Sequence, residues 1–278
     1  MRRRLLIRIG LGAVLPAAIV AAWHVTSLRS VVVPSIGSVV EILAHPFREP
    51  PNLDATSLAD SAAISFLRVL CGFSLAAITA VPIGLLVGRW RLAMDALSPT
   101  IASLMVISPI AWIPVAIIIF GLSSPATTLY GEEAWRHGLL DQLRFAIVAV
   151  IWMGAFFPIV LNTAAGARGV REAHVEAARV LGAGRRQLLL KVILPSAAPS
   201  IMTGLRVGGG IAWRVIIAAE IFPGTRSGLG YMITTAHEQA SYEYAFASIA
   251  VIGVIGLIID GTLRLAQARC ARWQPKER

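Results

Sequence analysis

The sequence contains 278 residues, of which 56% are hydrophobic and only 14% are charged. With a mean hydropathy of +0.73, this composition excludes an ordinary soluble globular domain and predicts a membrane protein. The formal net charge of +10 would also suit a nucleic-acid-binding protein. The basic residues, however, form short clusters between apolar runs instead of one polar face, which is typical of membrane topology and speaks against a nucleic-acid partner.

Six apolar runs are long enough to cross a bilayer, whose hydrocarbon core of about 30 Å requires roughly 20 helical residues. In chain order they are approximately Ile9–Thr26, Val69–Val87, Ile101–Leu122, Phe145–Ala165, Ala197–Phe222 and Tyr244–Leu265. The first run follows the basic start MRRR and could be a signal peptide, but WHVTSLRS offers no convincing cleavage site, so we expect a retained helix. The predicted fold is all-α, a polytopic membrane protein with six transmembrane helices.

Lys and Arg collect on one side of these runs, which predicts that this side is cytoplasmic. The clusters lie before the first run, after the second, after the fourth and after the sixth, in residues 2–4, 89–91, 168–191 and 264–278. Both termini are therefore expected in the cytoplasm. Residues 1–64 form an N-terminal helix and an external segment, in which SIGSVVEILAHPF predicts a short interfacial helix. Residues 65–270 form the transmembrane core, and residues 271–278 a basic cytoplasmic tail.

The largest predicted cytoplasmic loop, residues 168–195, has its own pattern. Acidic and small residues recur there at helical spacing, namely Glu172, Ala173, Glu176 and Ala177. This predicts a helix that ends at the glycines around Gly182, because glycine relieves the left-handed position after a helix. A second short helix is expected over 185–192 and should stop at Leu194-Pro195, since proline disfavours helix in the residue before it. From these residues alone, an amphipathic segment lying on the inner leaflet fits equally well.

Charged side chains inside the runs cost about 2.5 to 3.5 kcal/mol each at mid-helix on insertion scales, so they mark functional sites or paired groups. The fifth run holds Arg206, Arg214 and Glu220. For Arg206 and Glu220 we favour pairing with neighbouring helices or snorkelling to the two interfaces, and both stay candidates for a substrate path together with Arg214. Asp260 is expected to pair locally with Arg264, one turn further along the chain.

Three further polar side chains are candidates for lining a path. Ser108 and Trp112 lie in the stretch SPIAWIPV, whose two prolines free backbone carbonyls that need protein or water partners. One α-helical turn separates them, which predicts a shared side of a kinked helix. Asn162, in the fourth run, either lines the path or bonds across helices.

The remaining motifs exclude several activities. The histidines form no H-E-x-x-H, no G-x-S-x-G occurs, and Cys71 and Cys270 lie in different environments, so neither a metal site nor a catalytic constellation is expected. The external insert of residues 123–142 either contacts a partner or is an ordinary loop, and His137 and His237 on that side are interpreted as surface residues.

The loop pattern Glu-Ala-Ala, three residues, Gly, nine residues, an aliphatic residue, one residue, Leu-Pro resembles the cytoplasmic signature of permease subunits of bacterial ABC importers. Its members are Glu176, Ala177, Ala178, Gly182, Val192 in place of the usual Ile, Leu194 and Pro195. From about residue 65 to 269, stretches such as FLRVLCGFSLAAITAVPIGLLVG, GAFFPIVLNTAAGAR and AAEIF are similar to the nitrate, sulfonate, taurine and bicarbonate branch of these permeases.

This resemblance implies a type I ABC importer permease in the bacterial inner membrane. The loop would be a coupling helix that docks on a separate ATP-binding subunit, with Ala177, Ala178 and Gly182 allowing close approach and Glu176 setting polar contacts. Two ATP-binding subunits, which bind ATP and magnesium, an extracytoplasmic solute-binding protein and a second copy of the chain are the implied partners. Because the chain has no G-x-x-x-x-G-K-[ST] loop, we expect it to hydrolyse no ATP and to need no cofactor of its own.

The branch resemblance favours a small oxyanion as substrate, delivered by the binding protein. Relatives often carry a basic residue at the position of Gly210, and we interpret Arg214, four residues later, as a source of positive potential along an anion path. A thiamine-precursor-like solute is the alternative substrate. A secondary transporter of a small anion is the alternative class, although such a protein needs deep ion-coupling carboxylates and usually repeated halves.

Overall fold

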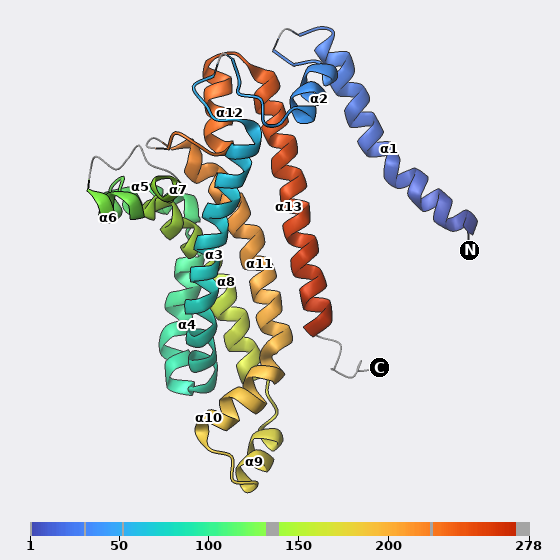
Figure 1. Cartoon of the computed structure of the whole chain (residues 1–278). Helices are drawn as coiled ribbons and strands as arrows, with labels where there is room; N and C mark the ends of the chain where they lie inside the picture. Colours follow the sequence, from blue (N-terminus) through green and yellow to red (C-terminus); the bar gives the residue numbers. More distant parts are fainter. Residues whose placement is uncertain (1, 31, 52, 132–138, 223–224, 271–278) are drawn as a thin grey trace. The chain divides into compact units, whose positions relative to one another are not determined.

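The computed structural model describes residues 2–30, 32–51, 53–131, 139–222 and 225–270, and the regular structure in these ranges is helical throughout (Figure 1). The expected all-α class is confirmed. The helices are α1 (Arg2–Ser27), α2 (Ile36–Ala44), α3 (Leu58–Arg89), α4 (Arg91–Val106), η1 (Pro109–Trp112), α5 (Ile113–Phe120), α6 (Pro125–Tyr130), α7 (Leu139–Gln142), α8 (Phe145–Arg168), α9 (Glu172–Val180), α10 (Arg185–Leu188), η3 (Leu189–Ile193), α11 (Leu194–Ile221), α12 (Leu229–Glu238) and α13 (Tyr242–Cys270).

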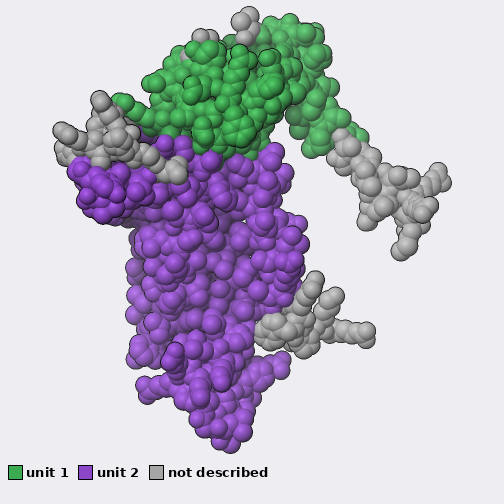
Figure 2. Space-filling view, in the orientation of Figure 1, with its two compact units in different colours: residues 1–62, 226–252 green, residues 63–225, 253–278 purple. Residues whose placement is uncertain are grey.

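The chain divides into two compact units, which Figure 2 colours separately. The first contains residues 1–62 and 226–252, and the second contains residues 63–225 and 253–278. The predicted basic tail of residues 271–278 lies outside the described residues, as does His137.

The first unit is held together by small apolar contacts around α2, α12 and the start of α13. Ser35 begins α2 by accepting a hydrogen bond from the Ser38 backbone N–H at 3.1 Å, so the predicted short helix in this external segment is confirmed. Trp23, near the end of α1, donates its indole N–H to the Pro34 carbonyl at 3.1 Å and stacks on Phe246 with ring centroids 5.4 Å apart.

In the second unit, α3 approaches α8 through a stripe of small residues that recur every four positions, one turn apart on the same helix face. The stripe consists of Gly72, Ala76, Ala80, Gly84 and Gly88. A Cβ atom on Gly84 would lie 2.6 Å from the Thr163 Cβ and 2.8 Å from the Val160 carbonyl oxygen, both on α8. Only glycine therefore lets the two backbones come this close, a packing mode typical of membrane helices.

The opposite side of α8 packs just as closely on α11, and the two helices run side by side in Figure 1. A Cβ on Gly204 would lie 2.8 Å from the Asn162 Cβ, and one on Gly208 would lie 3.0 Å from the Ala155 carbonyl oxygen. Ala155 and Ile159 of α8 are fully buried. Helix α8 is thus the centre of the unit, with α3 and α11 in close contact on either side.

Five helical stretches are long and apolar enough to cross a membrane: 58–89, 109–130, 145–168, 185–221 and 242–270. The first predicted span falls within α1, in which the apolar part with described side chains, Val14–Ser27, is shorter than a span. The predicted continuous span Ile101–Leu122 is wrong. Helix α4 ends at Val106, and Ile107 and Ser108 are extended, with ψ of 122° and 132°. Pro109 explains the break, because a proline excludes the helical region for the residue before it.

The external insert contains two of these short helices. Ser124 caps α6 by accepting from the Thr127 backbone N–H at 3.3 Å, and its hydroxyl also donates to the Asp141 carboxylate of α7 at 3.0 Å. Residues 132–138 of the insert lie outside the described residues. The described ends of this insert are therefore joined to one another by side-chain hydrogen bonds.

The close packing of α3 on α8 predicts opposite signs for two glycine-to-alanine changes. Gly84→Ala should lower the thermal stability of the purified chain by about 1 to 3 kcal/mol, since the added methyl overlaps Thr163 and Val160. Gly261→Ala, whose Cβ would meet nothing within 4 Å, should be neutral or raise stability by up to about 1 kcal/mol, because alanine is the better helix former. Thermal unfolding in detergent measures both, and equal effects would contradict the packing argument.

Candidate functional site

The cytoplasmic loop predicted from the sequence is a compact hairpin of helices, seen with α9 and α10 at one end of the second unit in Figure 1. Helix α9 ends in a Schellman motif: the Gly182 N–H donates to the Arg179 carbonyl at 2.9 Å, and the Ala183 N–H to the Ala178 carbonyl at 3.0 Å. Gly182 has a φ of +80°, a conformation that side chains rarely adopt. The predicted helix and its glycine terminus are both confirmed.

The second half of the loop differs from the prediction. The chain does not leave the helical conformation at Leu194-Pro195 but stays helical from Arg185 to Ile221. A single π turn, Leu189–Ile193, precedes Pro195, and the Leu194 N–H donates to the Leu189 carbonyl five residues back. The wider turn makes room where the proline ring would clash with the carbonyl four residues back in a regular α-helix, so no break is needed.

The loop is fixed to the helix bundle by an apolar core. Val175 of α9 is fully buried, and it packs with Leu188, Ile193 and residues at the ends of α3, α8 and α11. The latter are Leu85, Ala167, Val170, Ala197 and Ile201. An ion pair of 3.5 Å between Arg89, the last residue of α3, and Glu172 adds a polar contact at the rim. A force on the loop is therefore passed directly to α3, α8 and α11.

The exposed surface of the loop contains only part of the predicted coupling residues. Glu176, Ala177 and Gly182 are exposed, Ala178 is partly buried against the apolar core, Leu194 is partly buried in the long helix, and Pro195 is exposed on it. Two residues that sequence reasoning missed complete the surface: Val180 and Leu181 are each 87% exposed. Their signal was an apolar pair at the end of a polar helix, directly before the glycine.

Glu220 belongs to a sealed ion pair. It is fully buried, and its carboxylate accepts from the Arg68 guanidinium at 2.7 Å and from the Ser65 hydroxyl at 2.8 and 2.9 Å. The Arg68 Nε donates to the Gln142 carbonyl at 2.7 Å, and the Thr225 hydroxyl donates to the Glu220 carbonyl at 2.7 Å. The pair ties α3, α7 and α11 together. It supports the favoured interpretation of Glu220 as a paired group, although its partner Arg68 was not identified.

Arg206 is also paired, but in a more open setting. Its Nε and Nη2 donate to the two oxygens of Asp260 at 2.8 and 3.4 Å, which joins α11 to α13. The same carboxylate accepts from Arg264 at 3.1 Å, so the predicted local pair is confirmed. The side chains of Arg206 and Asp260 are 32% and 45% exposed, in contrast to the sealed Arg68–Glu220 pair.

An open groove of about 600 Å³ lies between α11 and α13. It brings Arg206, Arg214 and Asp260 into one lining, together with Thr203, Val207, Gly210, Trp213, Gly256, Ile259 and Gln267. Arg214 is exposed, and its Nε donates back to the Gly210 carbonyl at 3.1 Å. Its charge therefore sits one turn closer to Arg206 than its position in the sequence indicates.

The other predicted lining residues lie elsewhere. The break before Pro109 places Ser108 outside the helix and Trp112 at the end of a 3₁₀ turn, so the argument that an α-helical turn puts them on one side fails. The Trp112 indole N–H is buried and has no hydrogen-bond partner among the described residues. Asn162 donates to the Pro158 carbonyl in its own helix at 2.8 Å, and it faces Gly204 of α11. None of the three lines the groove.

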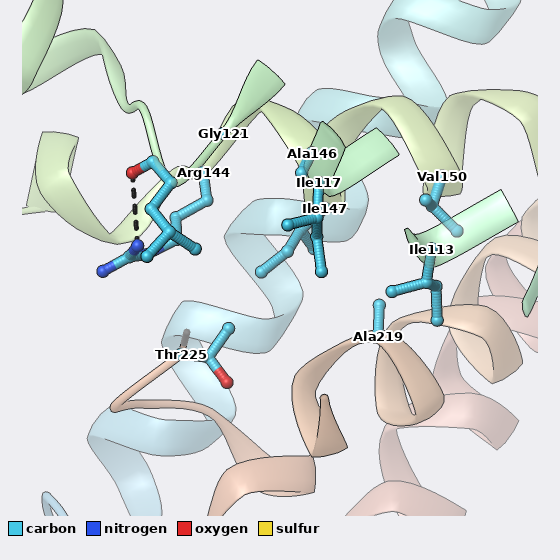
Figure 3. A pocket seen from close by; sticks show the side chains of 10 residues that line it. Ile113, Ile117, Gly121, Arg144, Ala146, Ile147, Val150, Ala219 and Thr225 are labelled. Atoms are coloured by element: carbon cyan, nitrogen blue, oxygen red, sulfur yellow. Dashed lines mark hydrogen bonds between the residues drawn. The ribbon is translucent and has the colours of Figure 1, made fainter. Parts of the chain in front are cut away.

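A second cavity, between α5, α8 and α11, is too small for a substrate (Figure 3). Its volume is about 20 Å³, which suits a single water molecule. Ile113, Ile147 and Val150 line its interior, while Arg144 at its edge donates to the Leu122 carbonyl at 3.2 Å. Among the described residues, no three His, Cys, Asp or Glu side chains gather where they could hold a metal.

Residues 80–272 match the family described as the binding-protein-dependent transport system inner membrane component, and the chain belongs to this family. It is the membrane-embedded permease subunit of an ABC importer. Membership in this family implies ATP-binding subunits and a solute-binding protein as partners. The resemblance identified from the loop signature is thereby confirmed.

Individual relatives cover most of the chain. MJ0413 of Methanocaldococcus jannaschii, which carries the name of an ABC transporter permease protein, is 37% identical over 94% of this chain and 90% of its own. The bicarbonate transport system permease CmpB of Synechococcus elongatus is 35% identical over 79% of this chain and 72% of its own. The taurine transport system permease TauC of Escherichia coli is 30% identical over 98% and 91%.

The fold has a solved counterpart. A chain of the MetNI methionine ABC transporter, in an inward-facing conformation, superposes with a TM-score of 0.55 over 84% of this chain and 98% of its own, at 16% identity. This similarity confirms the type I importer permease architecture.

The sealed pair predicts a large stability loss when one partner is removed. Glu220→Gln should lower the free energy of unfolding by about 3 to 5 kcal/mol, because it leaves the buried Arg68 charge without its counter-ion. The double variant Arg68→Met, Glu220→Leu should recover much of that loss, since no buried charge remains. Chemical or thermal unfolding in detergent compares the two. A single variant as stable as the wild type would show that the pair is not sealed from water.

Proposed function

We propose that this permease subunit imports a small oxyanion, in an ATP-driven complex with two ATP-binding subunits, a second copy of the chain and an extracytoplasmic solute-binding protein. In this proposal the chain lies in a bacterial inner membrane with both termini in the cytoplasm, and residues 168–195 meet the ATP-binding subunit. The chain supplies the path, and its partners supply ATP hydrolysis, with magnesium, and substrate capture.

One observation carries the coupling part of the proposal: the α9–Gly182–α10 hairpin is exposed at its tip and rigidly packed at its base. Ala177 and Gly182 leave the tip without bulky side chains, and Val180 and Leu181 add an exposed apolar contact. At the base, Val175 and Leu188 are buried in the core that includes α8 and α11. A partner that grips the tip would move the membrane helices without an intervening flexible linker.

The relatives' names and the groove charges support an oxyanion. CmpB and TauC are named for bicarbonate and taurine transport. The groove between α11 and α13 holds Arg206 and Arg214 against the single carboxylate of Asp260, so its lining is positive, as an anion path requires. The same charge balance disfavours a cationic, thiamine-precursor-like solute.

The carboxylates speak against the secondary-transporter alternative. Ion-coupled transporters need carboxylates that are free to bind and release a proton or cation at membrane depth. Glu220 is sealed by Arg68 and Ser65, and Asp260 is shared between Arg206 and Arg264. Both acids are thus already occupied by arginine.

The coupling proposal is tested by co-purification. The tagged chain, extracted gently from its native membranes, should bring down a soluble ATPase that mass spectrometry identifies. Gly182→Pro should lose most of it, because proline cannot adopt a φ of +80° and lacks the N–H that bonds to Arg179.

The matched control is Gly184→Ala. Gly184 has a φ of −70°, and a Cβ there would meet nothing within 4 Å, so its ATPase recovery should equal that of the wild type. If no ATPase accompanied the wild type, or if Gly182→Pro retained all of it, the loop would have to be reinterpreted as a segment lying on the inner leaflet.

The path proposal is tested by uptake. In cells that express the whole importer, Arg214→Gln should reduce uptake of the transported oxyanion by roughly tenfold or more, since the groove loses its unpaired cation. Co-purification of the ATPase should be unchanged. Arg269→Gln, at the exposed end of α13, serves as the control with normal uptake. Undiminished uptake by Arg214→Gln would remove this residue from the path.

A further inference from the structure

The groove between α11 and α13 carries a definite charge balance. Two arginines, Arg206 and Arg214, and one aspartate, Asp260, contribute to its lining, which leaves one net positive charge. The remaining lining residues are uncharged. In a partly desolvated site each unneutralised charge is costly, so the most favourable occupant brings the lining to neutrality.

The two arginines play different parts in this balance. Arg206 is held by both oxygens of Asp260, and Arg264 adds a hydrogen bond to the same carboxylate. Arg214 uses only its Nε, on the Gly210 carbonyl; among the described residues its two terminal nitrogens have no hydrogen bond or ion pair. Those nitrogens are the donors that are available to a ligand, and a guanidinium suits a planar or tetrahedral oxyanion with two parallel bonds.

The space around Arg214 is open on the side of the groove. A Cβ added to Gly210 would meet no atom within 4 Å, and Val207 next to it in the lining is exposed. Trp213 is buried in the wall, and Gln267 and Thr203 are joined by a hydrogen bond of 2.9 Å at the end of the groove near Arg206. A volume of about 600 Å³ admits a small anion together with water.

We propose that this groove binds monovalent oxyanions in preference to divalent ones, with Arg214 as the ligand-binding cation and Asp260 as the residue that sets the valence. This inference deepens the proposed function, because it names the substrate class of the same path. Asp260 neutralises one of the two lining arginines, so a single negative charge completes the balance. A second negative charge on the ligand would stand uncompensated beside Asp260.

Methanesulfonate and sulfate are suitable probes because both are tetrahedral sulfur oxyanions of similar size, with one and two negative charges. Their apparent dissociation constants are measured from the thermal unfolding midpoint of the purified full-length chain, in uncharged detergent at constant ionic strength. The wild type should bind methanesulfonate roughly tenfold or more tighter than sulfate, since one surplus charge in a desolvated groove exceeds the free energy of a tenfold change.

Two variants test the roles of the residues. Asp260→Asn raises the lining from one to two net positive charges and should reverse the preference in favour of sulfate. Arg214→Gln lowers the lining to zero and should abolish binding of both probes, even if Asp260→Asn fails to fold. Arg269→Gln, outside the groove, should bind as the wild type does. Tighter sulfate binding by the wild type, or an unchanged preference in a folded Asp260→Asn, would overturn the proposal.

A lipid phosphate has the same chemistry as a soluble oxyanion and needs its own arm. Phosphatidylglycerol is added to the delipidated chain at fixed methanesulfonate. Protection by the soluble anion in lipid-free detergent supports the proposal, whereas a response to the lipid alone would overturn it. ATPase co-purification with Arg214→Gln and Asp260→Asn separates this inference from the proposed function: retained ATPase with no anion response refutes the groove and leaves the coupling loop intact.

Discussion

The close contact of α8 with α3 and α11 is the constraint on which the second unit depends. Apolar surface gains little by leaving lipid, so membrane helices associate through dispersion contacts and internal polar bonds, which require short distances between backbones. Gly84 on α3 and Gly204 on α11 supply those short distances on the two sides of α8. The loop is packed on the ends of these same helices, and one wall of the groove is the free side of α11. Both functional elements therefore inherit their rigidity from the glycine contacts.

Charges inside this apolar unit have two distinct fates. Glu220 is enclosed with Arg68 and Ser65, where ion pairing and hydrogen bonds offset the cost of desolvation, and the result is a fixed tie between helices. Asp260 is half exposed and is shared by two arginines, so its bonds exchange at much lower cost. The chain thus separates a charge pair that fastens helices from a charge cluster that stays accessible to ions.

Features set by local chemistry were predictable from the sequence, and features set by distant partners were not. The Gly182 terminus of α9 and the start of α2 depend on a few neighbouring residues, and both were predicted correctly. Proline was ambiguous: Pro109 breaks its helix, whereas Pro195 is accommodated by a π turn, and only the packing of surrounding helices decides between these outcomes. Arg68 was missed because its partner lies 152 residues away, beyond any periodicity argument.

The π turn at Leu189–Ile193 has a consequence for the orientation of the long helix that follows it. One additional residue in a helical turn rotates everything beyond it by about 100° relative to a regular α-helix. The turn therefore sets the angular phase between the cytoplasmic hairpin and the face of α11 that bears Arg206 and Arg214. Removal of a single residue from it would leave both ends intact in sequence yet point the arginine face toward a different neighbour. The phase of α11 is encoded in those five residues and in no side chain of the groove itself.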